Sequence, residues 1–410
     1  MILQGKRIVL GITGSIAAYK VIEVARQLTV AGATVDVIMT EDATRFVTPL
    51  TLQTLTQRPV LIDMFRLLET AQIGHVALGE RADVLVVAPA TANVLARMAQ
   101  GVADNLLLTT YLATRAPVVV APAMNVNMWE HPATQANVAA LRERGVLFVG
   151  PEHGRLASGA VGAGRLAAPE EIVGTLRQVL GRGGPLAGRR VVVTAGGTRE
   201  PVDPVRYLGN RSSGKMGYAL AQAAIDRGAA VTLVTAPTQL RPPTGAQVVA
   251  VETVLEMRDA VLDSVAQADA LIMAAAAADF RPARAEVQKI KKEKTQRLTL
   301  TLERAPDILL EVARLRARGQ GPAVVVGFAA ETEDLVEQAR EKLLRKDLDL
   351  VVANDIRAPD SGFGADTNRV TLLAADGTRE DLPLLPKSEV AERVLERVAE
   401  LIRNDVKRKT

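Results

Sequence analysis

The chain begins the same structural pattern twice. An apolar run at residues 7–11 leads into a glycine turn at 11–15 and a stretch with helical apolar spacing at 16–28. The pattern restarts with an apolar run at 190–194 and a second glycine turn at 195–198. Buried strands that alternate with helices are typical of a parallel, doubly wound sheet. The repetition therefore predicts an α/β protein with two doubly wound, mainly parallel domains.

The segment 181–188 is the best candidate for the boundary between these domains, because it is short and rich in Gly and Pro. A chain of 410 residues is also too long for one typical core. We expect a first domain at 1–180, a linker at 181–188 and a second domain at 189–410. Further strands are expected at 34–39, 84–87, 117–120, 146–150, 230–235, 271–275, 299–302, 323–327 and 349–353. Further helices are expected at 48–56, 134–144, 170–180, 214–227, 253–267, 307–318, 333–346 and 388–403.

The composition excludes several classes of function. There is no cysteine, so disulfides and thiolate metal sites are ruled out, and three histidines argue against a clustered metal site. Aromatic residues make up 3% of the chain, which argues against a platform that stacks nucleic-acid bases. No apolar run approaches the ~18 residues that a membrane span needs, and the N-terminus has no signal-peptide pattern. The cytoplasm is the expected location.

The stretch Ala121–Trp129 follows the apolar strand at 117–120 and contains the single Trp of the chain. Open α/β sheets bind ligands at the carboxyl ends of their strands, so this loop is a candidate ligand site. The structural alternative is an ordinary strand-to-helix connection, in which Trp129 packs on the core and Asn125 is a turn residue. The residues alone leave both interpretations open.

Three other features of the first half have similar alternatives. The turn at 11–15 and the helix after it suit a phosphate, although the turn is not a dinucleotide fingerprint. His75 is the best general base in this half by its pKa near neutrality, but a single histidine is more often structural. The glycine-rich stretch 154–165 is interpreted as a mobile loop, either a lid or a plain connection.

The first half resembles the flavin-dependent cysteine decarboxylases. Pro122–Trp129 is similar to their substrate-recognition motif, and His75 and the segment Ala88–Asn93 occur in the same order and spacing. The resemblance implies FMN bound at a subunit boundary within a trimer, with His75 as the base and Asn125 on the substrate carboxylate. It also implies two sets of contacts: flavin contacts at Gly14, Ser15, Thr40, Ala88, Thr91 and Asn93, and a substrate contact at Met124 beside Asn125.

In that family a cysteinyl thiol is oxidised to a thioaldehyde, CO2 is lost, and the reduced flavin returns a hydride to the enethiol. A Cys on the mobile loop protonates the enethiol, and the resemblance assigns Ser158 to its place. A hydroxyl is a far weaker acid than a thiol of pKa ~8.5. The resemblance implies that Ser158 is catalytic. Because a hydroxyl is the weaker acid, an impaired final reduction is one alternative.

The densest motif of the second half is residues 196–217. It has glycine turns at both ends, Arg206 and Arg211 for anions and Asn210 as an amide donor, and Ser212 to Gly214 are expected to cap the next helix. A long structured loop with solvated arginines is the alternative. Lysine is scarce, with 12 residues in the chain, yet six of them lie in two short stretches. These six are Lys289, Lys291, Lys292, Lys294, Lys342 and Lys346.

Residues 196–217 resemble the signature of phosphopantothenate–cysteine ligases. The resemblance implies activation of 4′-phosphopantothenate by CTP to an acyl-cytidylate, from which the cysteine amine displaces CMP. It implies that Asn210 stabilises the intermediate with Arg206 nearby, that Mg²⁺ accompanies CTP, and that lysines hold the triphosphate. The remaining implied substrate contacts are Ala276, Asp279, Lys289, Pro306, Asp307, Ile308, Leu309, Phe328, Lys342 and Lys346.

The two resemblances together are those of the bifunctional enzymes of coenzyme A biosynthesis. They imply a homo-oligomer with trimeric flavoprotein domains and dimeric ligase domains, for which a dodecamer is one option, and no nucleic-acid or membrane partner. Three alternatives remain: a ligase fused to a flavoprotein with an impaired last step, a non-catalytic binding or regulatory flavoprotein subunit, and a flavin prenyltransferase relative. The prenyltransferase alternative leaves residues 196–346 unexplained.

Overall fold

The computed structural model describes residues 2–65, 74–291, 297–331, 335–355 and 364–409. The chain divides into two compact units, one up to Leu180 and one from Gly181 onward. Each unit is built around a mainly parallel sheet, which confirms the expected α/β class. None of the described helices combines the length and the apolarity that crossing a membrane requires.

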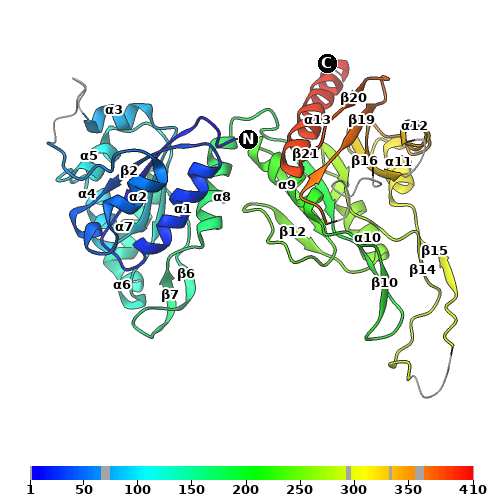
Figure 1. Cartoon of the computed structure of the whole chain (residues 1–410), viewed down its shortest axis with the longest axis horizontal. Coiled ribbons are helices and arrows are strands. Elements are labelled where there is room, and N and C mark those ends of the chain that lie inside the picture. Colours follow the sequence, from blue (N-terminus) through cyan, green and yellow to red (C-terminus); the bar gives the residue numbers. More distant parts are fainter. Residues whose placement is uncertain (1, 66–73, 292–296, 332–334, 356–363, 410) are drawn as a thin grey trace. The chain divides into compact units, whose positions relative to one another are not determined.

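The first unit has a five-stranded parallel sheet in the order β2-β1-β3-β4-β5 (Figure 1). Its strands are β1 (Arg7–Ile12), β2 (Thr34–Met39), β3 (Val84–Ala90), β4 (Val118–Pro122) and β5 (Leu147–Phe148). Its helices are α1 (Ala18–Val30), η1 (Glu41–Arg45), α2 (Pro49–Thr56), α3 (Gly74–Arg81), α4 (Ala92–Gln100), α5 (Leu106–Ala113), α6 (Val126–Glu130), α7 (Pro132–Glu143) and α8 (Pro169–Gly181).

Alternating strand residues face two separate cores in this unit. Leu10 on β1 packs with α1, α2 and α8, whereas its neighbour Val9 packs with α4, α5 and α7. Because side chains alternate across a strand, a strand buried on both faces is apolar throughout. All seven residues of β3 are buried accordingly. The helices thus cover both faces, and the ends of the strands remain for a site.

The glycine-rich stretch is a β-hairpin rather than the mobile loop that we expected. Strands β6 (Glu152–Arg155) and β7 (Val161–Arg165) pair antiparallel. A Cβ at Gly162 would lie 2.6 Å from the Val126 side chain, and one at Gly164 would lie 2.3 Å from the Met124 carbonyl oxygen. These glycines are therefore needed for close packing against the loop before α6, so the glycine content does not indicate flexibility here.

The second unit has an eight-stranded sheet in the order β12-β11-β8-β13-β16-β17-β19-β20. The pairs from β12 to β17 are parallel, and β19 and β20 join antiparallel. Its strands are β8 (Arg190–Ala195), β9 (Arg199–Pro201), β10 (Tyr207–Gly209), β11 (Ala230–Thr235), β12 (Gln247–Ala250), β13 (Ala270–Met273), β14 (Phe280–Pro282), β15 (Leu302–Arg304), β16 (Val324–Glu331), β17 (Leu350–Asp355), β18 (Thr367–Asn368), β19 (Val370–Ala374), β20 (Arg379–Asp381) and β21 (Leu385–Pro386).

Helices cover both faces of this second sheet as well. They are α9 (Lys215–Asp226), α10 (Val254–Val265), α11 (Ile308–Ala317), α12 (Leu335–Arg345) and α13 (Lys387–Lys409). Helices α9 and α13 pack on one face, and α10, α11 and α12 pack on the other. Three small antiparallel pairs lie outside the main sheet: β9–β10, β14–β15 and β18–β21 (Figure 1). The sequence did not predict β9, β10 or β14, because three-residue strands carry too little pattern.

The segment 181–188, which we expected to be a linker, begins the second unit and packs into it. Leu186 is fully buried in the core of the second unit. A Cβ at Gly184 would lie 2.4 Å from the carbonyl oxygen of Arg227, and the amide of Leu186 donates to that same oxygen at 2.9 Å. The segment is therefore packed into the second unit, and its glycines permit close contact with the end of α9.

Candidate functional site

The carboxyl edge of the first sheet brings together two segments that lie about 75 residues apart in sequence. The Thr13 hydroxyl donates to the carbonyl oxygen of Pro89 at 2.6 Å, and it accepts from the amide of Thr91 at 3.2 Å. Ala88, which precedes Pro89, is fully buried. The turn after β1 and the segment 88–93 therefore form one site, as open α/β sheets favour.

Several implied flavin contacts lie at the starts of helices on this edge. Thr40 is the N-cap of η1 and Thr91 is the N-cap of α4, and each hydroxyl accepts a backbone amide of its own helix at 3.3 Å. Ser15 accepts from the amide of Ala17 at 3.2 Å, and no side chain caps α1. A Cβ at Gly14 would lie 2.5 Å from the Cβ of Asp42. The glycine therefore lets the turn approach η1 closely.

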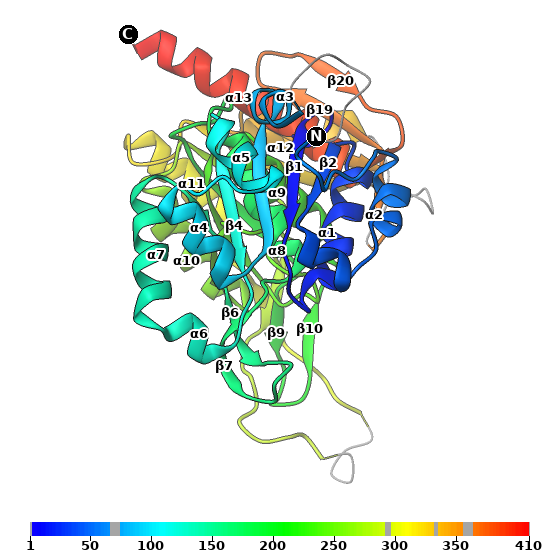
Figure 2. The ribbon, with the colours of Figure 1, turned by 90° about the vertical axis from the view of Figure 1, so that its left-hand side faces the viewer.

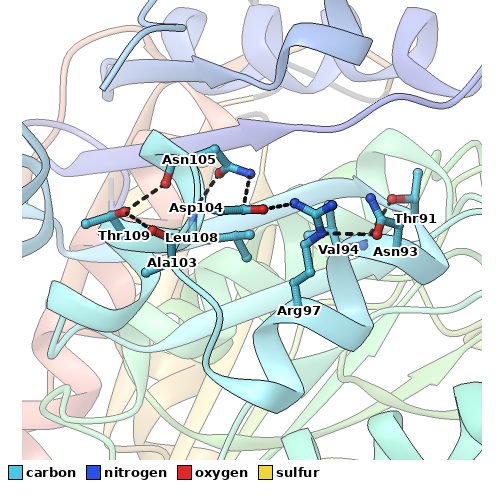
Figure 3. Close-up of polar contacts among 9 residues, drawn as sticks. All are labelled: Thr91, Asn93, Val94, Arg97, Ala103, Asp104, Asn105, Leu108 and Thr109. Atoms are coloured by element: carbon cyan, nitrogen blue, oxygen red, sulfur yellow. Dashed lines mark hydrogen bonds and ion pairs between the residues drawn. The ribbon is translucent and has the colours of Figure 1, made fainter. Parts of the chain in front are cut away.

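Asn93 is held by a chain of polar contacts that the sequence did not reveal (Figure 3). Its Oδ1 accepts from Nε of Arg97 at 3.2 Å, and Arg97 forms an ion pair with Asp104. Asp104 also accepts from the side-chain Nδ2 of Asn105, the residue that caps α5. The i, i+4 spacing of Asn93 and Arg97 was the available signal.

The β6–β7 hairpin contacts the loop before α6 through two candidate catalytic residues. Nδ2 of Asn125 donates to Oγ of Ser158 at 3.2 Å, and Oδ1 of Asn125 accepts from the amide of Asn127 at 2.9 Å. The amide of Met124 donates to the carbonyl oxygen of Gly164 at 2.9 Å. Asn125 thus caps α6 while its donor faces outward, so it is both a turn residue and a candidate binding group.

Trp129 has the place that the structural alternative assigned to it. Its side chain is partly buried and packs against the core of α4, α5 and α7.

His75 lies away from these residues within one copy of the chain. It is the second residue of α3, which packs against α5: the Thr114 hydroxyl donates to the carbonyl oxygen of Gly79 at 2.8 Å. Figures 1 and 2 show α3 near the amino ends of the strands, whereas α6 and the hairpin lie at the carboxyl ends. Nδ1 of His75 is buried and has no hydrogen-bond partner among the residues that the structure describes.

The carboxyl edge of the second sheet gathers the dense motif and the segment after β13. The amide of Ala276 donates to the carbonyl oxygen of Gly196 at 2.8 Å, and the amide of Ala278 donates to the Thr198 hydroxyl at 3.0 Å. Nδ2 of Asn210 donates to the carbonyl oxygens of Ala276 and Ala277 at 3.2 and 3.3 Å. The structure therefore places Asn210 beside Ala276.

Of Ser212, Ser213 and Gly214, which we expected to cap α9, only Gly214 does so. Gly214 is the N-cap, in a left-handed conformation with φ +78°, and no side chain caps the helix. Ser212 instead accepts the amide of Gly214 at 3.4 Å, a long contact. A Cβ at Gly214 would lie 2.6 Å from the Thr238 side chain, so position 214 needs glycine for both conformation and space.

Lys342 lies in α12 and Lys346 directly follows this helix, and each contacts another of the implied substrate-binding residues. Nζ of Lys342 donates to the carbonyl oxygen of Phe328 at 2.6 Å. Nζ of Lys346 forms an ion pair with Asp307 at 2.9 Å, and Asp307 also caps α11. Pro306 is half-buried and Ile308 and Leu309 are buried, as the start of α11 packs on the core.

Asp279 and Lys289 are exposed, and each lies in a segment tied to another part of the unit. The carbonyl oxygen of Asp279 accepts from the amide of Ala305 at 2.9 Å. Nη1 of Arg206 donates to the carbonyl oxygen of Ile290, beside Lys289, at 3.3 Å. Lys292 and Lys294 lie outside the described residues. Within the residues described, no three acidic or histidine side chains are grouped as a metal site.

Two family models match this chain, and each covers one structural unit. Residues 2–181 match the family described as flavoprotein, and residues 186–402 match the family described as the C-terminal domain of DNA/pantothenate metabolism flavoproteins. The second match covers more than half of the chain.

Similar proteins extend over nearly the whole chain. The coenzyme A biosynthesis bifunctional protein CoaBC of Bacillus subtilis is 45% identical over 402 residues, which are 97% of this chain and 98% of that protein. Its namesake from Mycobacterium tuberculosis is 48% identical over 404 residues, 96% of each chain, and the one from Vibrio cholerae is 45% identical over 401 residues, 97% of this chain and 99% of that protein. The chain therefore belongs to the family of bifunctional coenzyme A biosynthesis proteins, which unite a decarboxylase and a ligase in one polypeptide.

Proposed function

We propose that the second unit ligates cysteine to 4′-phosphopantothenate with CTP, and that the first unit decarboxylates the phosphopantothenoylcysteine to 4′-phosphopantetheine with FMN. The observation that supports this division most directly is that the two family matches together span residues 2–402 and change over at the boundary between the two units. The product of the second unit is the substrate of the first.

The proposed ligase step needs groups for the phosphates of two substrates and a donor near the activated carboxyl. Lys289, Lys342 and Lys346 supply positive charge for the CTP triphosphate, and Mg²⁺ is expected to accompany it. Asn210 stabilises the acyl-cytidylate, whose reactive carbonyl needs oriented donors. Its contacts with two backbone carbonyls hold the side-chain amide at the edge of the sheet, and the reactive carbonyl would replace one of these two acceptors.

The first unit fits FMN at the edge described above. The α1 helix starts without a side-chain cap, so its amides and the Ser15 hydroxyl suit a phosphate. The ring system would then lie along Thr40, Ala88, Thr91 and Asn93. A flavoprotein family match over residues 2–181 supports a flavin here. Bound FMN would supply the redox chemistry, accepting electrons from the thiol side and returning them after CO2 is lost.

The residues of this chain orient the substrate and exclude other reactions. Asn125 donates outward through Nδ2, which suits the carboxylate that leaves as CO2, since its Oδ1 is already used by its own turn. Ser158 lies against the same amide, so the hairpin closes over the proposed substrate position. His75 takes up the proton of the substrate.

Membership of the bifunctional family favours a complete decarboxylase reaction over the alternatives with an impaired last step or a non-catalytic flavoprotein subunit. We propose that Ser158 supports the final protonation, and that the N–H of Asn125 assists by donating to its oxygen. Single-turnover reoxidation of the flavin under anaerobic conditions tests this. A much faster reoxidation in Ser158→Cys than in wild type would revive the impaired-step alternative.

The separation of His75 from Asn125 within one copy supports a site shared between copies of the chain. We propose that His75 of one copy acts at the Asn125 edge of another, in a homo-oligomer with trimeric flavoprotein units and dimeric ligase units. Coexpression of His75→Asn with Asn125→Asp, under two different tags, tests this. Mixed oligomers should regain CO2 release that neither variant shows alone, and a mixture that stays inactive while both variants form CMP would refute it.

One assay tests both activities together. The protein is supplied with phosphopantothenate, cysteine, CTP and Mg²⁺, and CMP and CO2 are followed separately. We expect a yellow protein that releases FMN rather than FAD, and CO2 that follows CMP. A colourless protein that does not take up FMN would refute the decarboxylase proposal. A protein that forms no CMP in this assay, but releases CO2 when phosphopantothenoylcysteine is added, would refute the ligase proposal.

A further inference from the structure

Asp203 is a buried carboxylate in the loop between β9 and β10, and no role has been assigned to it above. The residue is 4% exposed, and both of its carboxylate oxygens accept hydrogen bonds. Oδ1 accepts from the amides of Val205 and Arg206, both at 2.8 Å. Oδ2 accepts from Nη1 of Arg206 at 2.5 Å and from the amide of Ile290 at 3.1 Å. Buried polar groups of this kind are retained only where they are well satisfied.

These contacts keep the carboxylate ionised. Burial raises the pKa of Asp203, but the backbone amides of Val205, Ile290 and Arg206, together with the Arg206 charge, hold that pKa below its ordinary value. The group is therefore a fixed negative charge at neutral pH, and the donors from Val205, Arg206 and Ile290 all bind this one carboxylate.

The partners of Asp203 belong to two segments that are far apart in sequence. Arg206 lies in the dense motif, and Ile290 follows Lys289 in the segment between β14 and β15. Nη1 of Arg206 also donates to the carbonyl oxygen of Ile290, so the two residues are bonded to each other as well as to Asp203. Next to Asp203, the carbonyl oxygen of Val202 accepts from the amide of Glu286 at 2.9 Å.

This anchoring matters because the segment that carries Lys289 is otherwise exposed. The side chains of residues 283–289 are exposed throughout, and Val287 is 86% exposed. A surface segment without a core contact depends on its hydrogen bonds for a defined position. The amide of Ile290 is one residue from Lys289, so its bond to Asp203 limits where the Lys289 side chain starts.

We infer that Asp203 is a positioning residue of the ligase site, which holds the Arg206 guanidinium and the Lys289 backbone in one arrangement before the substrates bind. It acts through these two residues and has no contact with the reacting atoms. The inference rests on the proposed role of Lys289 at the CTP triphosphate and on the implied place of Arg206 near the acyl-cytidylate. Preorganised cations bind anions more tightly, because less ordering remains to be done on binding.

The Asp203→Asn variant tests the inference with little change in volume. An amide keeps one acceptor for the turn, but its NH2 group faces the donors of Ile290 and Arg206. We expect KM for CTP to rise by about tenfold or more, as for the loss of charged hydrogen bonds, while kcat changes by less than about threefold. CO2 release from supplied phosphopantothenoylcysteine should stay unchanged, since the first unit holds that site.

Glu200→Gln is the matched control. Glu200 is equally buried, lies on β9 and accepts the amide of Val254 at 2.9 Å, which joins it to the start of α10 instead of the lysine segment. The Glu200→Gln substitution should lower Tm and leave KM for CTP unchanged. A wild-type KM in Asp203→Asn, or an equal rise in Glu200→Gln, overturns the inference.

A second variant covers the case in which Asp203→Asn does not fold. Ile290→Pro removes the backbone donor to Oδ2, also restricts the backbone of Lys289, and keeps the bonds of Asp203 to Val205 and Arg206. It should raise KM for CTP in the same direction, and an unchanged KM would overturn the inference. A wild-type protein that forms no CMP would refute the ligase proposal itself, and this inference with it.

Discussion

The two candidate sites hold their side chains in different ways. In the flavoprotein unit, the hydroxyl or amide oxygens of Thr40, Thr91 and Asn125 accept amides two or three residues further along the chain. In the ligase unit, Asn210 contacts Ala276 and Ala277 across 66 and 67 residues, and Arg206 contacts Ile290 across 84. The first site is placed mainly by local capping, and the second by contacts between distant motifs.

This difference predicts how the two sites respond to substitution. A helix cap satisfies amides of its own first turn, so its loss is a local change in stability. A long-range contact fixes two motifs at once, so its loss disturbs groups that are not themselves substituted, and effects of neighbouring residues are not additive. The exceptions in the flavoprotein unit are the bonds of Thr13 to Pro89 and Thr91 and the Asn125–Ser158 contact. His75 is a further exception, because we expect it to reach another copy.

The largest expected effect is that of His75→Asn, which removes the proposed base without a large change in shape. General bases contribute about 10²- to 10⁴-fold to rate, so CO2 release should become undetectable or nearly so. CMP formation should be unchanged, because the ligase site lies in the other unit. If both activities fall together while circular dichroism shows an intact fold, the units are coupled and the comparison of independent sites is wrong.

Asn210→Asp should have the next largest effect, on the ligase alone. It replaces a donor with a carboxylate that faces the carbonyl oxygens of Ala276 and Ala277. Pyrophosphate release should fall by about two to three orders of magnitude, the range for the loss of an oriented donor at a reacting carbonyl. Wild-type rates of pyrophosphate release in this variant would remove Asn210 from the site.

The sequence predicted most parallel strands of both units, because strands buried on both faces are continuously apolar and leave a clear pattern. It did not predict β19, although all five residues of this strand are buried, or the helices α3, α4 and α5. It did not predict the β6–β7 hairpin, since its strands pair only with each other and its glycines serve contacts with Met124 and Val126. Such contacts are formed across the fold and have no periodic signature. The same reason explains why Leu186 was not expected to be buried.

The candidate site residues came from the resemblance, and the structure adds how some of them are held. Asn125 with Ser158, and Asn210 with Ala276, are brought into contact. The supporting residues Arg97, Asp104 and Asp203 were not identified, because a charged residue in a loop or on a helix reads as a solvated surface group. Their partners become visible only in three dimensions.

Lys346→Gln should have a smaller effect, on KM for CTP, and it also changes the surroundings of Asp307. Lys346 is 14% exposed and pairs with Asp307 at 2.9 Å, so its removal leaves a carboxylate without this cation beside the proposed triphosphate. We expect KM for CTP to rise by about tenfold, a loss typical of a charged contact. Asp307→Asn is the control: it keeps an N-cap residue for α11, removes the pair and should raise KM less. An equal or larger rise in Asp307→Asn would show that the pair, rather than the lysine charge on CTP, is what matters.

The smallest expected effect comes from the helix caps, and it tests the local side of the comparison. Thr91→Ala removes the hydroxyl that accepts the amide of Val94 in the flavoprotein unit, and should lower the free energy of unfolding by about 1 kcal/mol. Thr253→Ala is its match in the ligase unit, where Thr253 and Glu256 form a capping box at the start of α10.

Urea unfolding measures both losses, and FMN affinity and KM for CTP are measured on the same samples. Thr253→Ala should leave both binding constants unchanged, since the Thr253 side chain caps its own helix and Thr253 is not among the implied contacts. Thr91→Ala should weaken FMN binding slightly, because its hydroxyl is an implied flavin contact whose position is set by its own helix. A loss of FMN affinity of a hundredfold or more would mean that Thr91 fixes the whole edge through the turn after β1, and that the first site is as interdependent as the second.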